Sequence, residues 1–384
     1  MKLCHIVPSL EEKHGGPSRS VRALCAALAK HGHSVELLTT AVDAPRGGLS
    51  IEVSARFHIR TFRRCWPRRI CRCPGLAQAI QESAADIVHH HALWLRTLGY
   101  AAQHSKRRRV PLVISPRGMM STWAWGHHGW RKTLARTFIH PRALECATAW
   151  HATSLEERDD IRARGFDQFV CISPNGVSTP SATARADARA VWSQLCPELV
   201  PDRTALFYGR FHQKKRVIEL IDSWLENAPA AWTLLMVGVP EQYTPAELEA
   251  YVARAGAAGR VRAFDGSGRP APYSIASLFL LPSHSENFGL VIAESMANGI
   301  PVLVTDTTPW HEVNDRKCGW CVPWSEFGKA LRNATSLPAS ELQMMGEAAE
   351  KFVGDHYTWD NTVRSLEECY AKIARDGCAG SVPR

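Results

Sequence analysis

One segment of the C-terminal half constrains the fold of this chain more than any other. Ala276–Leu281 is an unbroken apolar run without polar alternation, which predicts a strand buried on both faces. A polar loop, Ser283–Asn287, follows it, and from Leu290 the apolar residues recur at helical spacing. Gly299 fits a left-handed helix end, and the apolar run Val302–Val304 predicts the next strand. This order of strand, loop, helix and strand is the repeating unit of a doubly wound parallel sheet.

The loop of this unit is well placed to bind an anion. Ligands of doubly wound sheets bind beyond the carboxyl ends of the strands, where such a loop opens into its helix. The first backbone N–H groups of a helix have no partner inside it. Those of Phe288, Gly289 and Leu290, next to Asn287, are therefore candidates to hold a phosphate. Gly289 has no side chain that would keep the anion away from the backbone.

Two carboxylates flank this anion site: Glu286 lies in the loop and Glu294 lies eight residues later, inside the helix. Because a phosphate repels a carboxylate, each is better placed to reach past it, to hydroxyl groups on either side. A nucleotide sugar offers such hydroxyls on its transferred sugar and on its ribose. The alternative is purely structural, with one Glu favoured by the helix dipole and a second Glu in solvent.

The same segment resembles the retaining glycosyltransferases of family 4, whose pattern is P-S-x-x-E-x-F-G-L-x-x-x-E-x-M-A-x-G-x-P-V. The matching residues are Pro282, Ser283, Glu286, Phe288, Gly289, Leu290, Glu294, Met296, Ala297, Gly299, Pro301 and Val302. The resemblance implies the α/β architecture called GT-B, in which two Rossmann-like domains, each with a doubly wound parallel sheet, face a central cleft. The expected parts are an N-terminal acceptor-side domain at 1–177, a linker at 178–202, a nucleotide-sugar donor domain at 203–355, and a C-terminal helix crossing back to the first domain at 356–384.

A second cationic loop fits the donor-binding role. Arg210 and Lys215 come just after a predicted strand, Ala205–Tyr208, and precede a helix. Two cations at a helix start oppose the helix dipole, so a phosphate ligand explains them better than solvation does. The family pattern here is G-R-L-x-x-x-K-G, and its Arg and Lys grip the donor diphosphate. In this chain Arg216 stands where the pattern has its last glycine.

In the N-terminal half, candidate site residues follow three predicted strands. Gly15 and Gly16 lie where the first strand turns into a helix, and the family carries a glycine pair here, beside the donor diphosphate. The pieces D-x-V-H-x-H-x-L-W and S-P-R-G-M resemble a branch of family 4 found in bacterial surface-polysaccharide clusters. They make His91 and Arg117 candidates to contact the donor sugar or the acceptor, and the sequence does not decide between these two. For His89 we expect a core histidine bonded to the backbone.

The net charge of +9 is unevenly distributed. Residues 203–384 hold 18 Lys/Arg and 21 Asp/Glu, so the remaining 28 Lys/Arg and 16 Asp/Glu give the first 202 residues a net charge of +12. Arginines cluster between residues 60 and 72. This pattern indicates either a solvated basic face or attraction to an anionic inner membrane or to an acceptor such as a polyprenyl-diphosphate-linked glycan. No nucleic-acid-binding motif accompanies the charge, so nucleic acid is not expected as a partner.

The twelve cysteines lack the spacing of a disulfide or zinc framework, which predicts reduced and mostly buried thiols. The run His89–His91 is not expected to bind a metal, because neighbouring side chains on a strand face opposite sides. No apolar run approaches the ~20 residues that span a bilayer, and the first one is too short for a secretory signal. We expect a cytoplasmic protein, with peripheral contact on the inner face of the membrane as an extension of that prediction.

The resemblance implies a retaining hexosyltransferase that uses a UDP- or GDP-linked sugar and acts in the synthesis of exopolysaccharide, capsule or O-antigen of lipopolysaccharide. It further implies that Glu286 orients the transferred sugar and that Glu294 holds the ribose. The chain contains no D-x-D motif, so we expect neither a metal nor another cofactor. Two other classes of protein fit the sequence less well. A catalytically idle GT-B binding module would have lost a phosphate cation or a glutamate, and a nucleotide-dependent oxidoreductase would need a G-x-G-x-x-G loop after its first strand.

Overall fold

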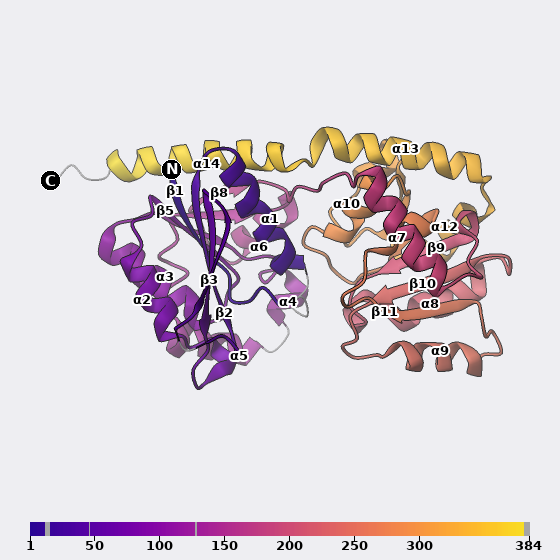
Figure 1. The fold of residues 1–384 in the computed structure, drawn as a ribbon, viewed down its shortest axis with the longest axis horizontal. Helices are drawn as coiled ribbons and strands as arrows, with labels where there is room; N and C mark the ends of the chain where they lie inside the picture. Colours follow the sequence, from indigo (N-terminus) through magenta and orange to yellow (C-terminus); the bar gives the residue numbers. More distant parts are fainter. Residues whose placement is uncertain (12–15, 46, 127–128, 380–384) are drawn as a thin grey trace. The chain divides into compact units, whose positions relative to one another are not determined.

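The chain forms two compact α/β units in the computed structural model (Figure 1). The structure describes residues 1–11, 16–45, 47–126 and 129–379. Unit 1 consists of Met1–Gly176 and Trp359–Arg384, and unit 2 consists of Val177–Thr358. The C-terminal segment therefore belongs to the same unit as the N-terminal half, and unit 2 is inserted between the two parts of unit 1 along the chain.

The sheet of unit 1 has eight strands in the order β3-β4-β2-β1-β5-β6-β7-β8. Only the edge strand β3 is antiparallel to its neighbour among the paired strands that the structure describes. The strands are β1 (Lys2–Ile6), β2 (Ser34–Ala41), β3 (Leu49–Ser54), β4 (Phe57–Arg63), β5 (Ile87–His91), β6 (Leu112–Ser115), β7 (Ala149–Ala152) and β8 (Phe169–Ile172). Strands β5, β6 and β7 are buried throughout, as expected for central parallel strands covered on both faces.

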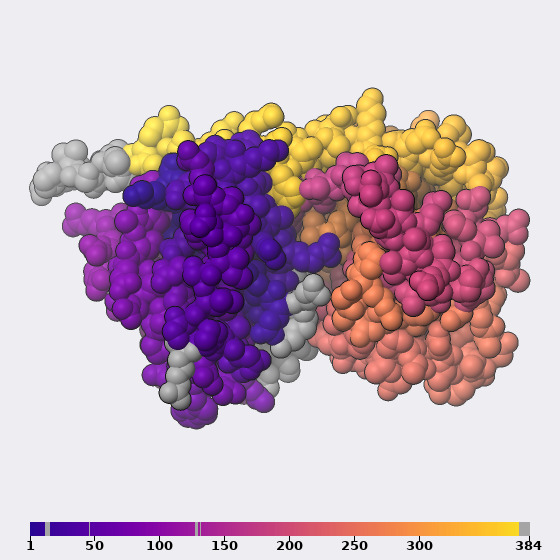
Figure 2. All heavy atoms as spheres, in the orientation of Figure 1, coloured from indigo at the N-terminus to yellow at the C-terminus, as the bar shows by residue number. Residues whose placement is uncertain are grey.

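Helices cover both faces of this sheet. They are α1 (Gly16–Lys30), η2 (Arg68–Ile70), α2 (Pro74–Glu82), α3 (Arg96–Arg108), α4 (Thr122–Gly126), α5 (Gly129–Leu134), η3 (Ala135–Ile139), α6 (Leu155–Ala163) and α14 (Trp359–Ala379). Apolar side chains of α2, α3 and α6 form one core with the sheet, and those of α1 and α14 form a second core. In Figures 1 and 2 helix α14 is the yellow rod that lies along unit 1. The C-terminal helix is thus part of the core of unit 1.

The sheet of unit 2 has six parallel strands in the order β11-β10-β9-β12-β13-β14. They are β9 (Thr204–Tyr208), β10 (Thr233–Gly238), β11 (Val261–Asp265), β12 (Leu278–Leu281), β13 (Val302–Thr305) and β14 (Gly319–Val322). The helices are α7 (Ala182–Leu195), η4 (Pro201–Arg203), η5 (Gln213–Lys215), α8 (Val217–Asn227), α9 (Pro245–Arg254), η6 (Pro272–Ile275), α10 (Leu290–Ala297), α11 (Glu312–Asp315), α12 (Trp324–Ser336) and α13 (Ala339–His356). The predicted unit around residues 276–304 is present as β12, α10 and β13.

The segment expected as a linker, residues 178–202, packs onto unit 2. It contains α7, whose Trp192 is fully buried in the core of that unit. The indole N–H of Trp192 donates a hydrogen bond to the carbonyl oxygen of Pro270 at 2.9 Å. Most of this segment is therefore a structural element of unit 2 and not a free connection.

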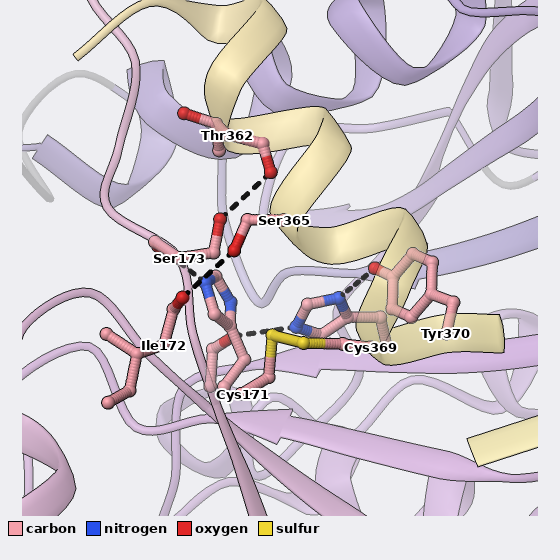
Figure 3. The surroundings of a disulfide bond; sticks show 10 residues. Cys171, Ile172, Ser173, Thr362, Ser365, Cys369 and Tyr370 are labelled. Atoms are coloured by element: carbon pink, nitrogen blue, oxygen red, sulfur yellow. Dashed lines mark hydrogen bonds between the residues drawn. A yellow bond between two sulfur atoms is a disulfide. The ribbon is translucent and has the colours of Figure 1, made fainter. Parts of the chain in front are cut away.

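A disulfide joins Cys171 in β8 to Cys369 in α14, with Cα atoms 5.9 Å apart (Figure 3). The prediction of reduced cysteines is wrong for this pair. The two residues are 198 positions apart in the sequence, and only the packing of α14 against β8 brings them together. Nine further cysteines, all those outside the pair whose side chains the structure describes, are free thiols, and seven of them are buried, as predicted.

Hydrogen bonds reinforce the disulfide along the same contact. The Ser173 hydroxyl donates to the carbonyl oxygen of Thr362 at 2.9 Å, and the Ser365 hydroxyl donates to that of Ile172 at 3.0 Å (Figure 3). Helix α14 is therefore held at the end of β8 by one covalent bond and by two hydrogen bonds beside it.

Candidate active site

The loop between β12 and α10 is fixed by the end of the neighbouring strand β13. The hydroxyl groups of Thr305 and Thr307 both donate to the carbonyl oxygen of Ser283, at 2.8 and 2.5 Å. The backbone N–H of Glu286 donates to the carbonyl oxygen of Thr307 at 3.2 Å. Since β12 and β13 pair in parallel, these bonds hold the loop at the carboxyl ends of both strands. This is the position that the sequence predicted for it.

Gly289 occupies a backbone conformation that requires glycine. Its φ of +73° lies in the left-handed region, and a Cβ atom built on it would come within 2.7 Å of Cδ1 of Ile292. Within the described part of the chain, no group accepts a hydrogen bond from the backbone N–H of Phe288, Gly289 or Leu290. These three donors are therefore available to an anion at the start of α10, as predicted.

The Phe288 side chain contributes to the core of unit 2. It is only 4% exposed and packs against Trp310 and Tyr357, with ring centroids 5.2 and 5.8 Å away. The indole N–H of Trp310 also donates to the carbonyl oxygen of Phe288. Its side chain thus anchors the loop, and its N–H group is the part that a ligand can reach.

Glu286 and Lys215 form an ion pair at the carboxyl ends of β12 and β9, which are neighbours in the sheet. Both side chains are largely buried, with 11% and 13% exposed. Burial alone would raise the pKa of Glu286, but the charges of Lys215 and Lys214 outweigh it and hold the pKa below its ordinary value. Glu286 is therefore an ionised carboxylate fixed in orientation, which can accept hydrogen bonds but has no proton to donate at neutral pH.

Arg210, the second predicted phosphate cation, pairs with Glu241 at 2.9 Å, and its side chain is 35% exposed. Glu241 was not among the residues selected from the sequence. It follows β10, the strand on the other side of β9, so its position at a strand end was the available signal. Each of the two predicted cations is thus paired with a carboxylate, which a diphosphate can replace.

Arg216 adopts the backbone conformation for which the family pattern has glycine. Its φ of 51° and ψ of 45° lie in the left-handed region, immediately before α8. That conformation costs about 1–2 kcal/mol for a residue with a Cβ atom. The guanidinium lies over the ring of Trp324, 4.8 Å from its centroid, and this contact offsets part of the cost. The arginine is therefore accommodated, and Lys215 keeps its place.

Glu294 lies half-buried in α10 and accepts a hydrogen bond from the Tyr273 hydroxyl at 2.9 Å. Tyr273, in η6, is buried and holds this carboxylate from the side of the sheet. The predicted role of Glu294 toward a ribose stays a prediction. The contact shows that one carboxylate oxygen is oriented by the protein.

In unit 1 the glycine pair is only partly described. Gly16 is the first residue of α1, and a Cβ atom built on it would meet nothing within 4 Å. Gly15 lies outside the described residues. The predicted contact of this pair with a donor diphosphate stays a prediction.

His91 and Arg117 are in contact, inside unit 1. The Arg117 guanidinium donates to Nδ1 of His91 at 3.1 Å and to the side-chain oxygen of Asn175 at 2.8 Å. His91 is fully buried, and its other ring nitrogen is bonded to His5 at 3.0 Å. Burial lowers the pKa of Arg117 to about 10, so it stays a cation at neutral pH. Both ring nitrogens of His91 are thus engaged, while Arg117, at φ 54°, keeps a strained backbone at the end of β6.

A chain of hydrogen bonds runs from α14 through the sheet of unit 1. His151 must donate from Nε2, because its partner there is the carbonyl oxygen of Ser173. Its Nδ1 therefore accepts from the Ser115 hydroxyl at 2.8 Å, and Ser115 in turn accepts from Nε2 of His89 at 2.7 Å. The remaining His89 nitrogen, Nδ1, accepts from the Tyr370 hydroxyl at 2.6 Å. His89 is a core histidine as expected, but its partners are side chains and not the backbone.

His5, His89 and His91 form the one group among the described residues with the proximity that a metal site needs, with ligand nitrogens within 4.8 Å of one another. Their chemistry does not fit a cation. The Arg117 guanidinium touches His91, and both nitrogens of His89 already have hydrogen-bond partners. We therefore assign this group to the polar core of unit 1.

Both units match known protein families. Residues 15–176 match the family described as "Glycosyl transferase 4-like domain", and residues 197–352 match "Glycosyl transferases group 1". The D-inositol 3-phosphate glycosyltransferase of Actinosynnema mirum is 31% identical over 94% of this chain and 93% of its own length. The chain belongs to glycosyltransferase family 4. It is a glycosyltransferase that acts on nucleotide sugars, and the expectation drawn from the sequence is confirmed at this level.

Two further relatives define the fold and the range of the family. The GDP-mannose:cellobiosyl-diphosphopolyprenol alpha-mannosyltransferase of Xanthomonas campestris is 26% identical over 62% of this chain and 60% of its own length. The crystal structure of Anabaena Alr3699/HepE in complex with UDP and glucose superposes with a TM-score of 0.74 at 17% identity, covering 97% of this chain and all of the other. The family 4 enzyme therefore has the GT-B fold. None of the helices that the structure describes has the length and apolarity needed to traverse a bilayer.

Proposed function

We propose that this enzyme transfers a hexose, with retention of anomeric configuration and without a metal, from a UDP- or GDP-linked sugar to a glycan or lipid-linked acceptor in bacterial surface-polysaccharide synthesis. The observation that carries the proposal is the Lys215–Glu286 pair beside three free N–H groups at the start of α10. The mannosyltransferase relative, named for a GDP-sugar donor and a polyprenol-diphosphate acceptor, supports the choice of substrates. Contact of unit 1 with an anionic membrane belongs to the same proposal.

The geometry supports a defined division of labour. When a donor diphosphate approaches, its oxygens accept hydrogen bonds from Lys215, from Arg210 and from the N–H groups at Phe288 and Gly289. Lys215 then no longer neutralises Glu286, whose carboxylate becomes free to accept hydrogen bonds from hydroxyls of the transferred sugar. Breaking the glycosidic bond moves negative charge onto the departing diphosphate. Cations and peptide dipoles fixed beside it stabilise that charge, and one such donor contributes about 3–4 kcal/mol of barrier.

The remaining candidates are assigned by their places in the fold. Glu294, held by Tyr273, binds the ribose hydroxyls from α10. Arg117 is 8% exposed and lies at the edge of the buried polar core of unit 1, whereas His91 is fully enclosed, so we assign Arg117 to contact with the sugar or acceptor. His91 then acts by orienting Arg117.

A donor screen tests the proposal. The purified enzyme is incubated with UDP-, GDP- and ADP-linked glucose and mannose, and release of the nucleotide is measured alongside Lys215→Ala, Glu286→Ala and the exposed control Lys329→Ala. We expect turnover with a UDP- or GDP-sugar, a loss of about 10²–10³-fold in the first two variants, and no change in the control. Undiminished turnover in both site variants would overturn the assignment, and an inverted product anomer in the NMR spectrum would overturn retention.

A further inference from the structure

A groove lies between helices α2 and α3 of unit 1, outside the proposed donor site. It encloses about 430 Å³ and is lined by Arg72, Gln78, Gln81, Arg96 and Tyr100, with apolar side chains between them. Its lining runs along α2 from Pro74 to Gln81 and along the first turns of α3, at Arg96 and Tyr100. No Asp or Glu lines it, and its formal charge is therefore positive.

The two arginines keep donors available to a ligand. Among the described residues, Arg72 uses only Nη1, which donates to the carbonyl oxygen of Trp66 at 3.1 Å. Arg96 likewise uses only Nη1, which donates to the carbonyl oxygens of Ile139 at 2.8 Å and Phe138 at 3.4 Å. Neither arginine has a carboxylate partner within the part of the chain that the structure describes. Each guanidinium therefore still presents Nε and Nη2, the fork that suits a phosphate group.

The same hydrogen bonds hold the backbone of two residues with exposed aromatic side chains next to the arginines of this groove. Trp66 is 84% exposed and Phe138 is 70% exposed, the two largest values for a large hydrophobic side chain among the described residues. Trp66 is tied to the groove through Arg72, and Phe138 through Arg96. Next to Trp66, Arg68 and Arg69 of η2 are also exposed. Burying such aromatic rings away from water is favourable, so two exposed rings beside arginines are candidates to contact a partner.

We propose that this groove binds the phosphate group of an anionic membrane lipid, with Trp66 and Phe138 entering the headgroup layer on either side. Exposed aromatic rings beside arginines are the side-chain combination that membrane interfaces favour. The net charge of +12 in the first 202 residues adds long-range attraction to an anionic surface. The inference rests on the proposed lipid-linked acceptor for its biological sense. Its test uses neither donor nor acceptor, so the two can fail separately.

The test is co-sedimentation of the full-length enzyme with vesicles of phosphatidylcholine, with and without phosphatidylglycerol. We expect binding only to the anionic vesicles. Each cation near an anionic surface contributes about a fivefold gain in affinity, so Arg72→Gln/Arg96→Gln should bind roughly thirtyfold more weakly. Trp66→Ser/Phe138→Ser should show a loss of at least tenfold, because the inserted rings are removed while the charge is unchanged.

A matched control lies on the same helix. Arg107→Gln/Arg108→Gln removes the same charge from the other end of α3, about 17 Å from Arg96, and should change binding less than twofold. An equal loss of vesicle binding in the control would overturn the groove as the binding site and would leave diffuse charge attraction as the explanation. Absence of vesicle binding by the unaltered enzyme would overturn the lipid, even if inorganic phosphate alone raised the melting midpoint of the enzyme. If Arg96→Gln lowers the melting midpoint, the exposed Trp66→Ser variant decides the question by itself.

Discussion

The two units place different chemistry at the carboxyl ends of their strands. Unit 1 fills this region with buried imidazoles, and burial lowers the pKa of His5 and His151 to about 3. Unit 2 fills the equivalent region with an ion pair, in which the pKa of Glu286 is lowered although the residue is largely buried. One fold therefore carries a cluster of neutral imidazoles with a single buried cation, Arg117, in one unit and a fixed pair of opposite charges in the other.

The difference follows from what each group needs once it leaves water. A neutral imidazole is both donor and acceptor, so the imidazoles of His89 and His151 are fully bonded by two hydroxyl groups and a carbonyl inside unit 1, and only Nε2 of His5 lacks a partner in this cluster of described histidines. A buried charge instead needs a counter-charge, and Lys215 and Glu286 supply that to each other. A pair of this kind can exchange a partner for an anionic ligand, whereas a closed neutral network has nothing to exchange. This is why the donor diphosphate is assigned to unit 2.

The largest expected effect is a difference in acid stability between the units. Five histidines of unit 1, His5, His89, His90, His91 and His151, have a pKa lowered by burial from 6.5. The unfolded chain then binds more protons, so stability is complete above pH 6.5 and is lost as the pH falls toward about 3. At one pH unit below 6.5 each histidine costs about 1.4 kcal/mol, or about 7 kcal/mol for the five.

Calorimetry at a series of pH values measures this effect. A bound nucleotide raises the midpoint of the unit that holds it, which identifies the transition of unit 2. The lowered pKa of Glu286 stabilises unit 2 above about pH 4.5 and that contribution is lost only below this value. The half-exposed His212 and His284 add a smaller loss below pH 6.5. Parallel loss of both transitions between about pH 6.5 and 5.5 would contradict the comparison, and His58→Gln, outside the cluster, should change neither.

The second prediction concerns the disulfide, which belongs to unit 1 alone. Cys369→Ala should lower the free energy of unfolding of unit 1 by about 2–5 kcal/mol, because the cross-link no longer restricts the unfolded chain. Chemical denaturation with and without dithiothreitol measures it. The reductant should destabilise the unaltered enzyme and have no further effect on the variant, while Cys146→Ala, a free thiol of the same unit, should retain the response to reductant. A response of equal size in Cys369→Ala would show that the bond is absent in solution.

The comparison also separates what the sequence could predict from what it could not. The site of unit 2 was predictable because its residues, Glu286 to Glu294, are close in the sequence and share one loop and helix. Lys215 was found for the same reason, by its place between a strand and a helix. Local periodicity and capping determine such a unit, and its contacts with the sheet follow from parallel pairing.

The missing parts all depend on contacts between distant segments. The hydrogen bond from Tyr370 to His89 spans 281 residues, and the disulfide spans 198. Both exist because α14 returns to unit 1. The family resemblance implied that return, but nothing in the local sequence of β5 or β8 indicates which residues α14 contacts. Glu241, the partner of Arg210, was missed because a strand-end carboxylate has no distinctive spacing. Sequence patterns therefore located the candidate site residues at strand ends and helix starts but did not predict the contacts that hold them.

The third prediction concerns the energy of the charged pair in unit 2. Lys215→Met and Glu286→Gln should each lower the free energy of unfolding by about 2–3 kcal/mol, since each leaves a poorly solvated charge without its partner. The double variant should cost less than the sum by about 1–3 kcal/mol in a double-mutant cycle. Arg60 and Glu36, a more exposed pair of unit 1 with 37% and 29% of their side chains exposed, serve as the control, and their coupling should stay below about 1 kcal/mol. Equal coupling in the two pairs would mean that burial does not distinguish them.

The smallest expected effect tests the direction of the hydrogen bonds in unit 1. Tyr370→Phe removes the hydroxyl that donates to Nδ1 of His89 and leaves that nitrogen buried without a partner, which should cost about 1–2 kcal/mol. Urea denaturation measures the cost, and Tyr251→Phe, whose hydroxyl bonds Asp222 at the surface, should stay within about 0.5 kcal/mol. Nitrogen NMR adds a qualitative readout. If the hydrogen bonds run in order from the Tyr370 hydroxyl to the Ser173 carbonyl, His89 carries its proton on Nε2 in both proteins, because Ser115 still accepts the hydrogen bond from Nε2. A proton on Nδ1 of His89 in the unaltered protein would contradict the assigned order, because Nε2 would then need the hydrogen that the Ser115 hydroxyl donates to His151.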